Sequence, residues 1–206
     1  MTSHPLHPEA TLQRTSLKEI AEQSIRQAIF AGRLSAGTIY PEAVFAKSLQ
    51  ISVTPVREAL INLAAKELLI HVPRKGFKIR QFNQKDVKDI FDYREMLESA
   101  IISRLIPQIT DLAIVELENI LAEYTWLKQD GAKPHVYVNL GRRFHLGLAE
   151  LCGSPCCRRA LERIGDLCDL AGVGAFSANG GAEQAQREHQ AILSGIKKGH
   201  VQSSGV

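Results

Sequence analysis

The sequence predicts a mainly α protein with two parts, an N-terminal winged helix-turn-helix and a C-terminal all-α antiparallel helical bundle. Three observations support this fold class. Two short amphipathic patterns joined by a tight turn fall between residues 41 and 68, a hairpin pattern follows at residues 69–82, and the segments after residue 83 have helical spacing. At 206 residues with 45% hydrophobic side chains, the chain is long enough for two small domains.

The first helix is predicted to begin at Ser16, after a flexible arm at residues 1–14. The arm contains two prolines and two histidines and has no apolar periodicity. Ser16 and Glu19 have the spacing of a capping box, in which each side chain satisfies a free backbone amide of the other residue. Apolar residues then recur at helical spacing until Gly32, and residues 34–38 are typical of a turn.

A helix-turn-helix is predicted from Pro41 to Leu68. Pro41 begins a short helix that ends at Leu49, residues 51–53 form the connection, and a longer helix begins near Thr54. Two helices joined by such a short turn are typical of this motif. The side chains expected to face inward share apolar character and helical spacing; they are Phe45, Ala46, Leu49, Ile51, Val56, Leu60 and Leu63.

A β-hairpin is predicted directly after these helices. Residues 69–72 form one short strand, residues 77–82 alternate as a second strand, and a glycine-containing turn joins them. The turn carries Arg74, Lys75 and Gly76. We therefore expect its basic tip to extend from the domain as a wing.

The remainder is predicted to be helical and to form a second domain over residues 83–206, behind a winged domain over residues 15–82. Clusters of proline and glycine separate the helical patterns, among them the glycine-rich residues 172–181. The predicted helices are Lys85–Ile106, Asp111–Gln129, His135–Cys152, Pro155–Ala171 and Ala182–Lys198.

The excess of basic over acidic residues lies in the N-terminal part of the chain. Residues 1–82 carry 11 Lys and Arg against 6 Asp and Glu, a net charge of +5, whereas residues 83–206 have a net charge of −2. This distribution indicates a polyanionic partner for the N-terminal domain alone. No apolar run approaches the roughly 18–20 residues of a membrane span, no secretory signal is present, and the four clustered cysteines are not a disulfide framework. We therefore expect a cytoplasmic protein with reduced thiols and no membrane partner.

Double-stranded DNA is the polyanion that best fits a winged helix-turn-helix. The side chains predicted to face outward at the start of the longer helix are Thr54, Pro55, Arg57 and Glu58. At these positions a recognition helix meets the major groove. Arg57 could bind a guanine through two hydrogen bonds or bind a phosphate, and both roles remain open.

Residues 20–82 resemble the winged helix-turn-helix of GntR-type bacterial transcription regulators. The run TPVREAL at residues 54–60 carries most of this resemblance, together with Gly32, Phe45 and Gly76. The second half resembles the all-helical ligand-binding (FCD) domain of the FadR-like branch. Its matching residues are Asp86, Val87, Ile90, Tyr93, Arg94, Leu97, Glu98, Arg143, Phe144, His145, Leu148, Glu188, His189, Ile192 and Leu193.

The resemblance implies a homodimeric transcriptional repressor that binds a palindromic operator. It adds Glu42 and Ser52 to the predicted DNA-binding residues. Three positions depart from the family pattern: Gln50 and Glu67 stand where glycine is usual, and Val53 stands where a DNA-contacting arginine is usual. We therefore expect reduced DNA affinity or an unusual operator, because one lost contact typically costs about 1–3 kcal/mol.

The resemblance also implies a small carboxylate effector and, in many such domains, a divalent metal such as Zn, Ni or Mn. The family binds this metal through an Asp and a His four residues apart and two further histidines. His145 and His189 match two of these positions, but the Asp position is Gly141, and the last histidine would lie beyond Val206. We therefore expect a shortened C-terminal domain and leave two roles open for His145 and His189, as metal ligands or as hydrogen-bonding groups of the core or pocket.

Arg94 is the third predicted effector-binding residue. It lies beside Phe91 and Tyr93 on an amphipathic helix, where its guanidinium could bind a carboxylate through two hydrogen bonds. The alternative is an ion pair with Glu98 one helical turn later. Both interpretations remain open.

Two alternative functions follow from the same residues. A regulator with an incomplete effector domain could fold but lack an effector response. A small helical metallohydrolase could use His145, His189 and a carboxylate, but the sequence has no nucleophile elbow, phosphate loop or H-E-x-x-H motif. We expect no enzymatic activity and no certain cofactor.

Overall fold

Helix α1 (Leu17–Phe30) begins the N-terminal domain in the computed structural model, which describes residues 16–129, 134–176 and 181–204. The Glu19 backbone N–H donates to Ser16 Oγ at 3.2 Å, and the Ser16 N–H donates to Glu19 Oε2 at 2.8 Å. This confirms the predicted capping box and explains why the helix starts here. The predicted arm at residues 1–14 lies outside the described residues.

Helices α2 (Glu42–Leu49) and α3 (Val53–Ala65) form the predicted helix-turn-helix. Gln50, which ends α2, has the left-handed conformation with φ 56° and ψ 38°. That backbone sends the chain directly into α3, but it costs a residue with a side chain about 1–2 kcal/mol. The side chains predicted to face inward are buried at Phe45, Ala46, Val56, Leu60 and Leu63, and partly buried at Leu49 and Ile51.

The wing is a hairpin of β2 (Leu69–Val72) and β3 (Gly76–Ile79), with Leu69 opposite Ile79. A third strand, β1 (Ile39–Tyr40), pairs with the other edge of β3 and gives the order β1-β3-β2. The sequence did not predict β1, because two residues are too short to show an alternating pattern. The second strand of the hairpin also ends at Ile79 rather than at residue 82.

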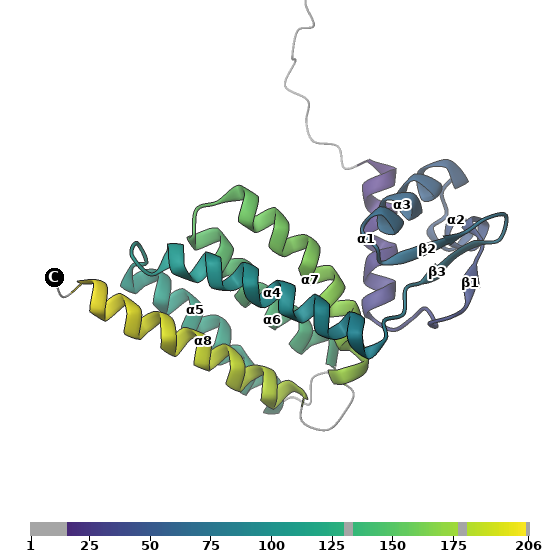
Figure 1. The fold of residues 1–206 in the computed structure, drawn as a ribbon. Helices are drawn as coiled ribbons and strands as arrows, with labels where there is room; N and C mark the ends of the chain where they lie inside the picture. The colour runs from purple at the N-terminus through teal and green to yellow at the C-terminus, as the bar shows by residue number, and fades with distance from the viewer. Residues whose placement is uncertain (1–15, 130–133, 177–180, 205–206) are drawn as a thin grey trace, which may run out of the picture.

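Five helices form the predicted bundle, with α4, α6 and α7 side by side and α5 against α8 (Figure 1). Their bounds are α4 Gln84–Leu105, α5 Asp111–Gln129, α6 Pro134–Leu151, α7 Pro155–Phe176 and α8 Gly181–Ser204. The end predicted for α7, Ala171, was wrong. A helical glycine costs only about 1 kcal/mol, and Gly172 is buried within the bundle.

Each domain has a hydrophobic core of its own, and α7 connects the two. The bundle core includes Ile101, Leu117, Tyr124, Phe144, Leu148 and Ile196. Leu167 and Leu170 of α7 pack against the core of the N-terminal domain, so α7 lies next to α1 (Figure 1).

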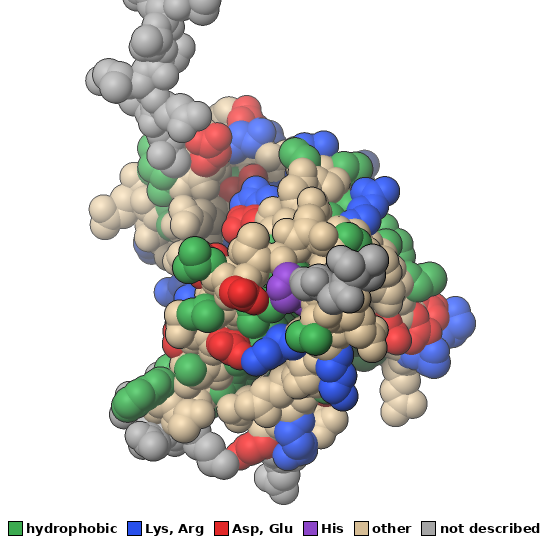
Figure 2. Space-filling view, turned by 90° about the vertical axis from the view of Figure 1, so that its left-hand side faces the viewer, with side chains coloured by type: hydrophobic (Ala, Val, Ile, Leu, Met, Phe, Trp, Pro, Cys, Tyr) green, Lys and Arg blue, Asp and Glu red, His purple; other side chains and the backbone are tan. Residues whose placement is uncertain are grey.

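The surface of the molecule is of mixed charge on the face shown in Figure 2, where acidic and basic side chains alternate. None of the described helices is both long enough and apolar enough to span a bilayer.

Candidate nucleic-acid interface and ligand cavity

The start of α3 and the wing enclose a shallow groove of about 580 Å³. Five of the predicted DNA-binding residues line it: Glu42, Arg57, Arg74, Lys75 and Gly76. Ser52, Thr54 and Glu58 are exposed at or near the start of α3, and Pro55 is half-buried in its first turn. The fold therefore brings side chains from α2, α3 and the wing to one concave face.

Arg57 forms an ion pair with Glu42 across this groove. Its Nε lies 3.0 and 2.8 Å from the two carboxylate oxygens, and its Nη2 lies 2.8 Å from Oε2. Hydrogen bonding to Glu42 raises the pKa of the guanidinium, which is charged in any case. The Arg57 side chain is 61% exposed, so Glu42 orients it along the surface without burying it. A surface pair of this kind is weak and can be exchanged for a contact with DNA.

The tip of the wing has a strained backbone that places its cations. Arg74 is left-handed, with φ 63°, and Gly76 has φ 128°. A Cβ atom at Gly76 would lie 2.2 Å from the carbonyl oxygen of Tyr40 in β1, so only glycine fits here. Arg74 and Lys75 are both exposed beside the groove.

A cavity of about 100 Å³ lies among α4, α6, α7 and α8. Arg94, His145 and His189, predicted as effector-binding residues, all line it, although they come from three different helices. Apolar side chains that include Phe91, Tyr137 and Leu161 complete the wall.

The two histidines face each other within hydrogen-bond distance. His189 Nε2 lies 2.9 Å from His145 Nε2, and His189 Nδ1 lies 3.1 Å from Tyr124 Oη. Burial, with smaller contributions from His145 and Arg94, lowers the pKa of His189 to about 3, so this imidazole is neutral at physiological pH. Both contacts can be hydrogen bonds when the Tyr124 hydroxyl donates to His189 Nδ1 and the His189 Nε2–H donates to His145 Nε2.

Arg94 forms the ion pair with Glu98 that was one of its two predicted roles. Its Nε lies 3.3 Å from Glu98 Oε1, and its guanidinium lies 5.0 Å from the centre of the Phe91 ring. His145 Nδ1 is also 2.8 Å from Glu98 Oε1, but the two atoms are not aligned for a hydrogen bond. Within the described part of the chain, both buried atoms therefore lack a hydrogen-bond partner. The second role of Arg94, carboxylate binding, stays a prediction.

Two family models match the two domains. Residues 17–79 match the bacterial regulatory proteins of the gntR family, and residues 89–204 match the FCD domain. The chain belongs to the GntR family of bacterial regulatory proteins, in the branch that carries an FCD domain.

Relatives of this GntR protein are transcriptional regulators. It is 28% identical to an uncharacterized HTH-type transcriptional regulator, YdhC of Bacillus subtilis, over 84% of this chain and 78% of that protein. It is 31% identical to the gluconate operon transcriptional repressor of Bacillus licheniformis, over 56% of this chain and about half (47%) of that protein. Among solved structures, Escherichia coli McbR/YncC has the same fold, with a TM-score of 0.75 and 21% identity over 91% of this chain and 89% of that one.

The metal site that the GntR resemblance implies does not fit the residues of this chain. Gly141, at the Asp position, supplies no ligand, and the two histidines use their Nε2 atoms to contact each other. A Cβ atom at position 141 would lie only 3.0 Å from His189 Cε1, so this imidazole takes the space beside Gly141. Over residues 16–129, 134–176 and 181–204, no group of three or more His, Cys, Asp or Glu side chains could hold a metal ion. We therefore assign no role to a metal.

Several residues of this GntR protein's two sites were not predicted from the sequence. Val53, noted only as a departure from the family, lines the groove between α3 and the wing together with His71. Arg142 and Asp169 line the cavity, and Arg142 Nη1 lies 2.7 Å from Asp169 Oδ2. Arg142 and Asp169 lie on different helices, and no sequence spacing connects them.

Proposed function

We propose that this GntR-family protein is a cytoplasmic transcriptional repressor that binds a palindromic operator as a homodimer and responds to a small organic acid. The groove formed by α2, α3 and the wing is the main support for the DNA-binding part of this proposal. An exposed arginine at the start of a recognition helix, with two cations on an adjacent wing, suits the major groove and its flanking phosphates.

The cavity among α4, α6, α7 and α8 supports the proposed effector. Arg94 and Arg142 present guanidinium groups to it, and its apolar wall suits the carbon skeleton of an organic acid. Both arginines already pair with carboxylates of the protein, so a ligand carboxylate has to compete for them. Two similar proteins are named repressors of a gluconate operon, which makes sugar acids a reasonable first class of ligand.

DNA binding can be tested with labelled duplexes selected by the wild-type protein from a random-sequence pool. We expect Arg57→Ala to weaken binding about tenfold or more, because a specific arginine contact is worth about 1–3 kcal/mol. Arg143→Ala is the matched control: Arg143 is equally exposed and also paired to one glutamate through two hydrogen bonds, but it lies on α6. Equal affinities of the wild type and Arg57→Ala would contradict the proposed interface.

Effector binding can be tested by melting the wild type and Arg94→Gln with acetate, L-lactate, citrate or D-gluconate at millimolar concentrations. We expect at least one acid to raise the melting temperature of the wild type and to change its DNA affinity, and Arg94→Gln to lose both effects. If no acid does so while DNA binding is intact, the regulator lacks this effector response.

A further inference from the structure

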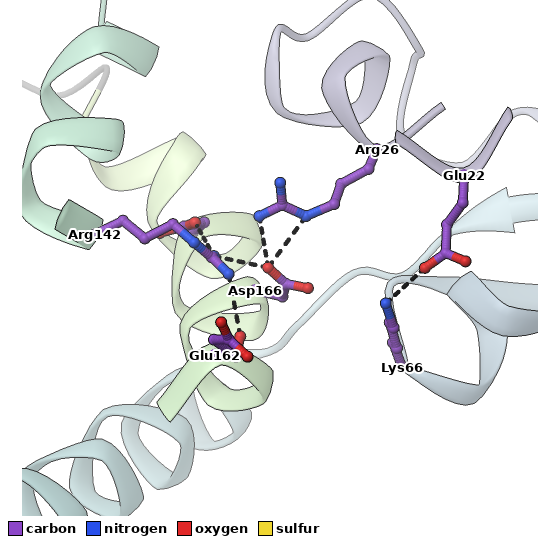
Figure 3. A network of polar contacts seen from close by, with 7 residues as sticks. Glu22, Arg26, Lys66, Arg142, Glu162 and Asp166 are labelled. Carbon is purple, nitrogen blue, oxygen red and sulfur yellow. Dashed lines mark hydrogen bonds and ion pairs between the residues drawn. The ribbon is translucent and has the colours of Figure 1, made fainter. Parts of the chain in front are cut away.

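A buried chain of charges connects the cavity to the DNA-binding domain (Figure 3). Asp166 of α7 accepts hydrogen bonds from Arg26 of α1, with Oδ1 at 2.6 Å from Nη2 and 3.2 Å from Nε. The same Oδ1 lies 2.7 Å from Nη1 of Arg142 on α6. One carboxylate oxygen therefore serves two arginines from different domains.

Arg142 is the member of this chain that reaches the cavity. It lines the cavity with Asp169, and its Nη2 also donates to the carbonyl oxygen of Glu162 at 3.2 Å (Figure 3). Gly165 lies under the guanidinium, since a Cβ atom there would be 3.5 Å from Arg142 Nη1. Although burial lowers the pKa of Arg142, Asp166 and Asp169 outweigh this effect and raise it, so the group stays charged.

The charges in this chain are balanced, and its two aspartates are largely shielded from water. Arg26 and Arg142 face Asp166 and Asp169, and the two aspartate side chains are only 9% and 12% exposed. An added anion at Arg142 is therefore only weakly screened by solvent, and the existing ion pairs have to change to accommodate it.

We propose that Arg142 binds the anionic group of a ligand in the cavity and that Asp166 transmits this event to Arg26. The inference rests on the proposed function, because it names how occupancy of the same cavity reaches the DNA-binding domain. An anion that attracts Arg142 leaves Asp166 Oδ1 to Arg26 alone. The contact between α1 and α7 then tightens, which restricts the orientation of the two recognition helices in a dimer and weakens operator binding.

The test needs no known ligand, because Arg142→Gln releases Asp166 to Arg26 in the same way. In the free protein, hydrogen–deuterium exchange should slow in residues 21–30 of α1 for Arg142→Gln, but not for Arg143→Gln. Arg143 is the next residue of α6 but pairs with Glu123 instead, and its side chain is 55% exposed. On a selected operator duplex, Arg142→Gln should weaken binding by about fivefold or more, the lower end of typical allosteric coupling. The double variant with Arg26→Gln should match Arg26→Gln alone within twofold.

Two results would overturn the proposal. One is unchanged hydrogen–deuterium exchange in α1 of a folded Arg142→Gln variant, and the other is additive effects of Arg142→Gln and Arg26→Gln on DNA affinity. If Arg142→Gln does not fold, Arg142→Lys retains a cation but cannot hold both aspartates, and the same exchange result is expected. The hydrogen–deuterium exchange experiment does not involve DNA. If the wild-type protein fails to bind DNA, the proposed function is refuted, but the exchange result still tests the connection from Arg142 to α1. With any acid that raises the melting temperature, Arg26→Gln should retain the melting shift and lose the effect on DNA affinity.

Discussion

His145 and His189 occupy the centre of the bundle as a directly hydrogen-bonded pair, with their Nε2 atoms 2.9 Å apart. Both residues are only 6% exposed, and each contacts a second polar group: Tyr124 Oη lies near His189, and Glu98 lies near His145. The pair therefore forms a buried part of the cavity wall, and its geometry depends on His189 staying neutral.

The neutral state of His189 predicts a loss of stability in mild acid. The unfolded chain binds a proton at this histidine below about pH 6.5, whereas the folded protein does so only near pH 3. The free energy of unfolding should therefore fall by up to about 1.4 kcal/mol per pH unit as the pH drops from 6 to 4. Urea denaturation at a series of pH values measures this slope. His189→Gln should reduce it, and His71→Gln, on the exposed wing, should not; equal slopes in both variants would refute the assignment to His189.

The left-handed residue Gln50 predicts that glycine stabilises the turn between α2 and α3. Relief of the left-handed conformation gains about 1–2 kcal/mol, and the greater freedom of glycine in the unfolded chain returns about 0.4–1 kcal/mol. Gln50→Gly should therefore raise the free energy of unfolding by up to about 1.6 kcal/mol. Gln23→Gly, the same change on an exposed position of α1, should lower it by about 1 kcal/mol. Chemical denaturation measures the free energy of unfolding of both variants. A destabilised Gln50→Gly would show that the backbone at Gln50 is unstrained in the wild type.

The apolar side chain of Val53 predicts a preference for thymine in the operator. Val53 is the first residue of α3, is 38% exposed and shares the groove with Arg57. The thymine methyl is the apolar group of the major groove, and burying one such group is worth about 0.8 kcal/mol, or about fourfold in affinity. Replacing one thymine by uracil in a single half-site should weaken wild-type binding by that factor and should leave Val53→Ala unaffected. Equal sensitivity of both proteins would exclude Val53 as the reader of that base.

Gly141 and Gly195 predict opposite effects for the same substitution. A Cβ atom at Gly141 would lie 3.0 Å from His189 Cε1 and 3.3 Å from Tyr124 Oη, whereas at Gly195 it would meet no atom within 4 Å. Gly141→Ala should cost about 1–3 kcal/mol by overpacking. Gly195→Ala, in the middle of α8, should gain up to about 1 kcal/mol of helix stability. Thermal melts of both variants give the answer, and a stabilised Gly141→Ala would mean that the histidine pair can move aside.

Local patterns made most of the fold predictable. The capping box of Ser16 and Glu19, the apolar spacing through Val56, Leu60 and Leu63, and the short alternating hairpin each depend on neighbours within a few residues. Such signals can be recognised in the sequence because the residues that interact are close together along the chain. The two-residue strand β1 was missed because it exists only through its pairing with β3.

The parts of the sites that could not be predicted depend on contacts between distant segments. Arg26 and Asp166 are 140 positions apart and meet only because α7 packs against α1. The sequence also allowed two roles for Arg94, and only the structure shows its ion pair with Glu98. Arg57 was predicted to face DNA, but its pairing with Glu42 depends on how α2 and α3 cross.

The close approach of Gly76 to the carbonyl of Tyr40 has a consequence for the position of the wing relative to the helix-turn-helix. Because β1 leads directly into α2, the hairpin tip and the first helix of the helix-turn-helix are fixed to a common backbone point. A single methyl group at position 76 would push Arg74 and Lys75 away from that point. If α3 and the tip both contact DNA as proposed, the distance between their two contact points is set by the absence of one carbon atom at position 76.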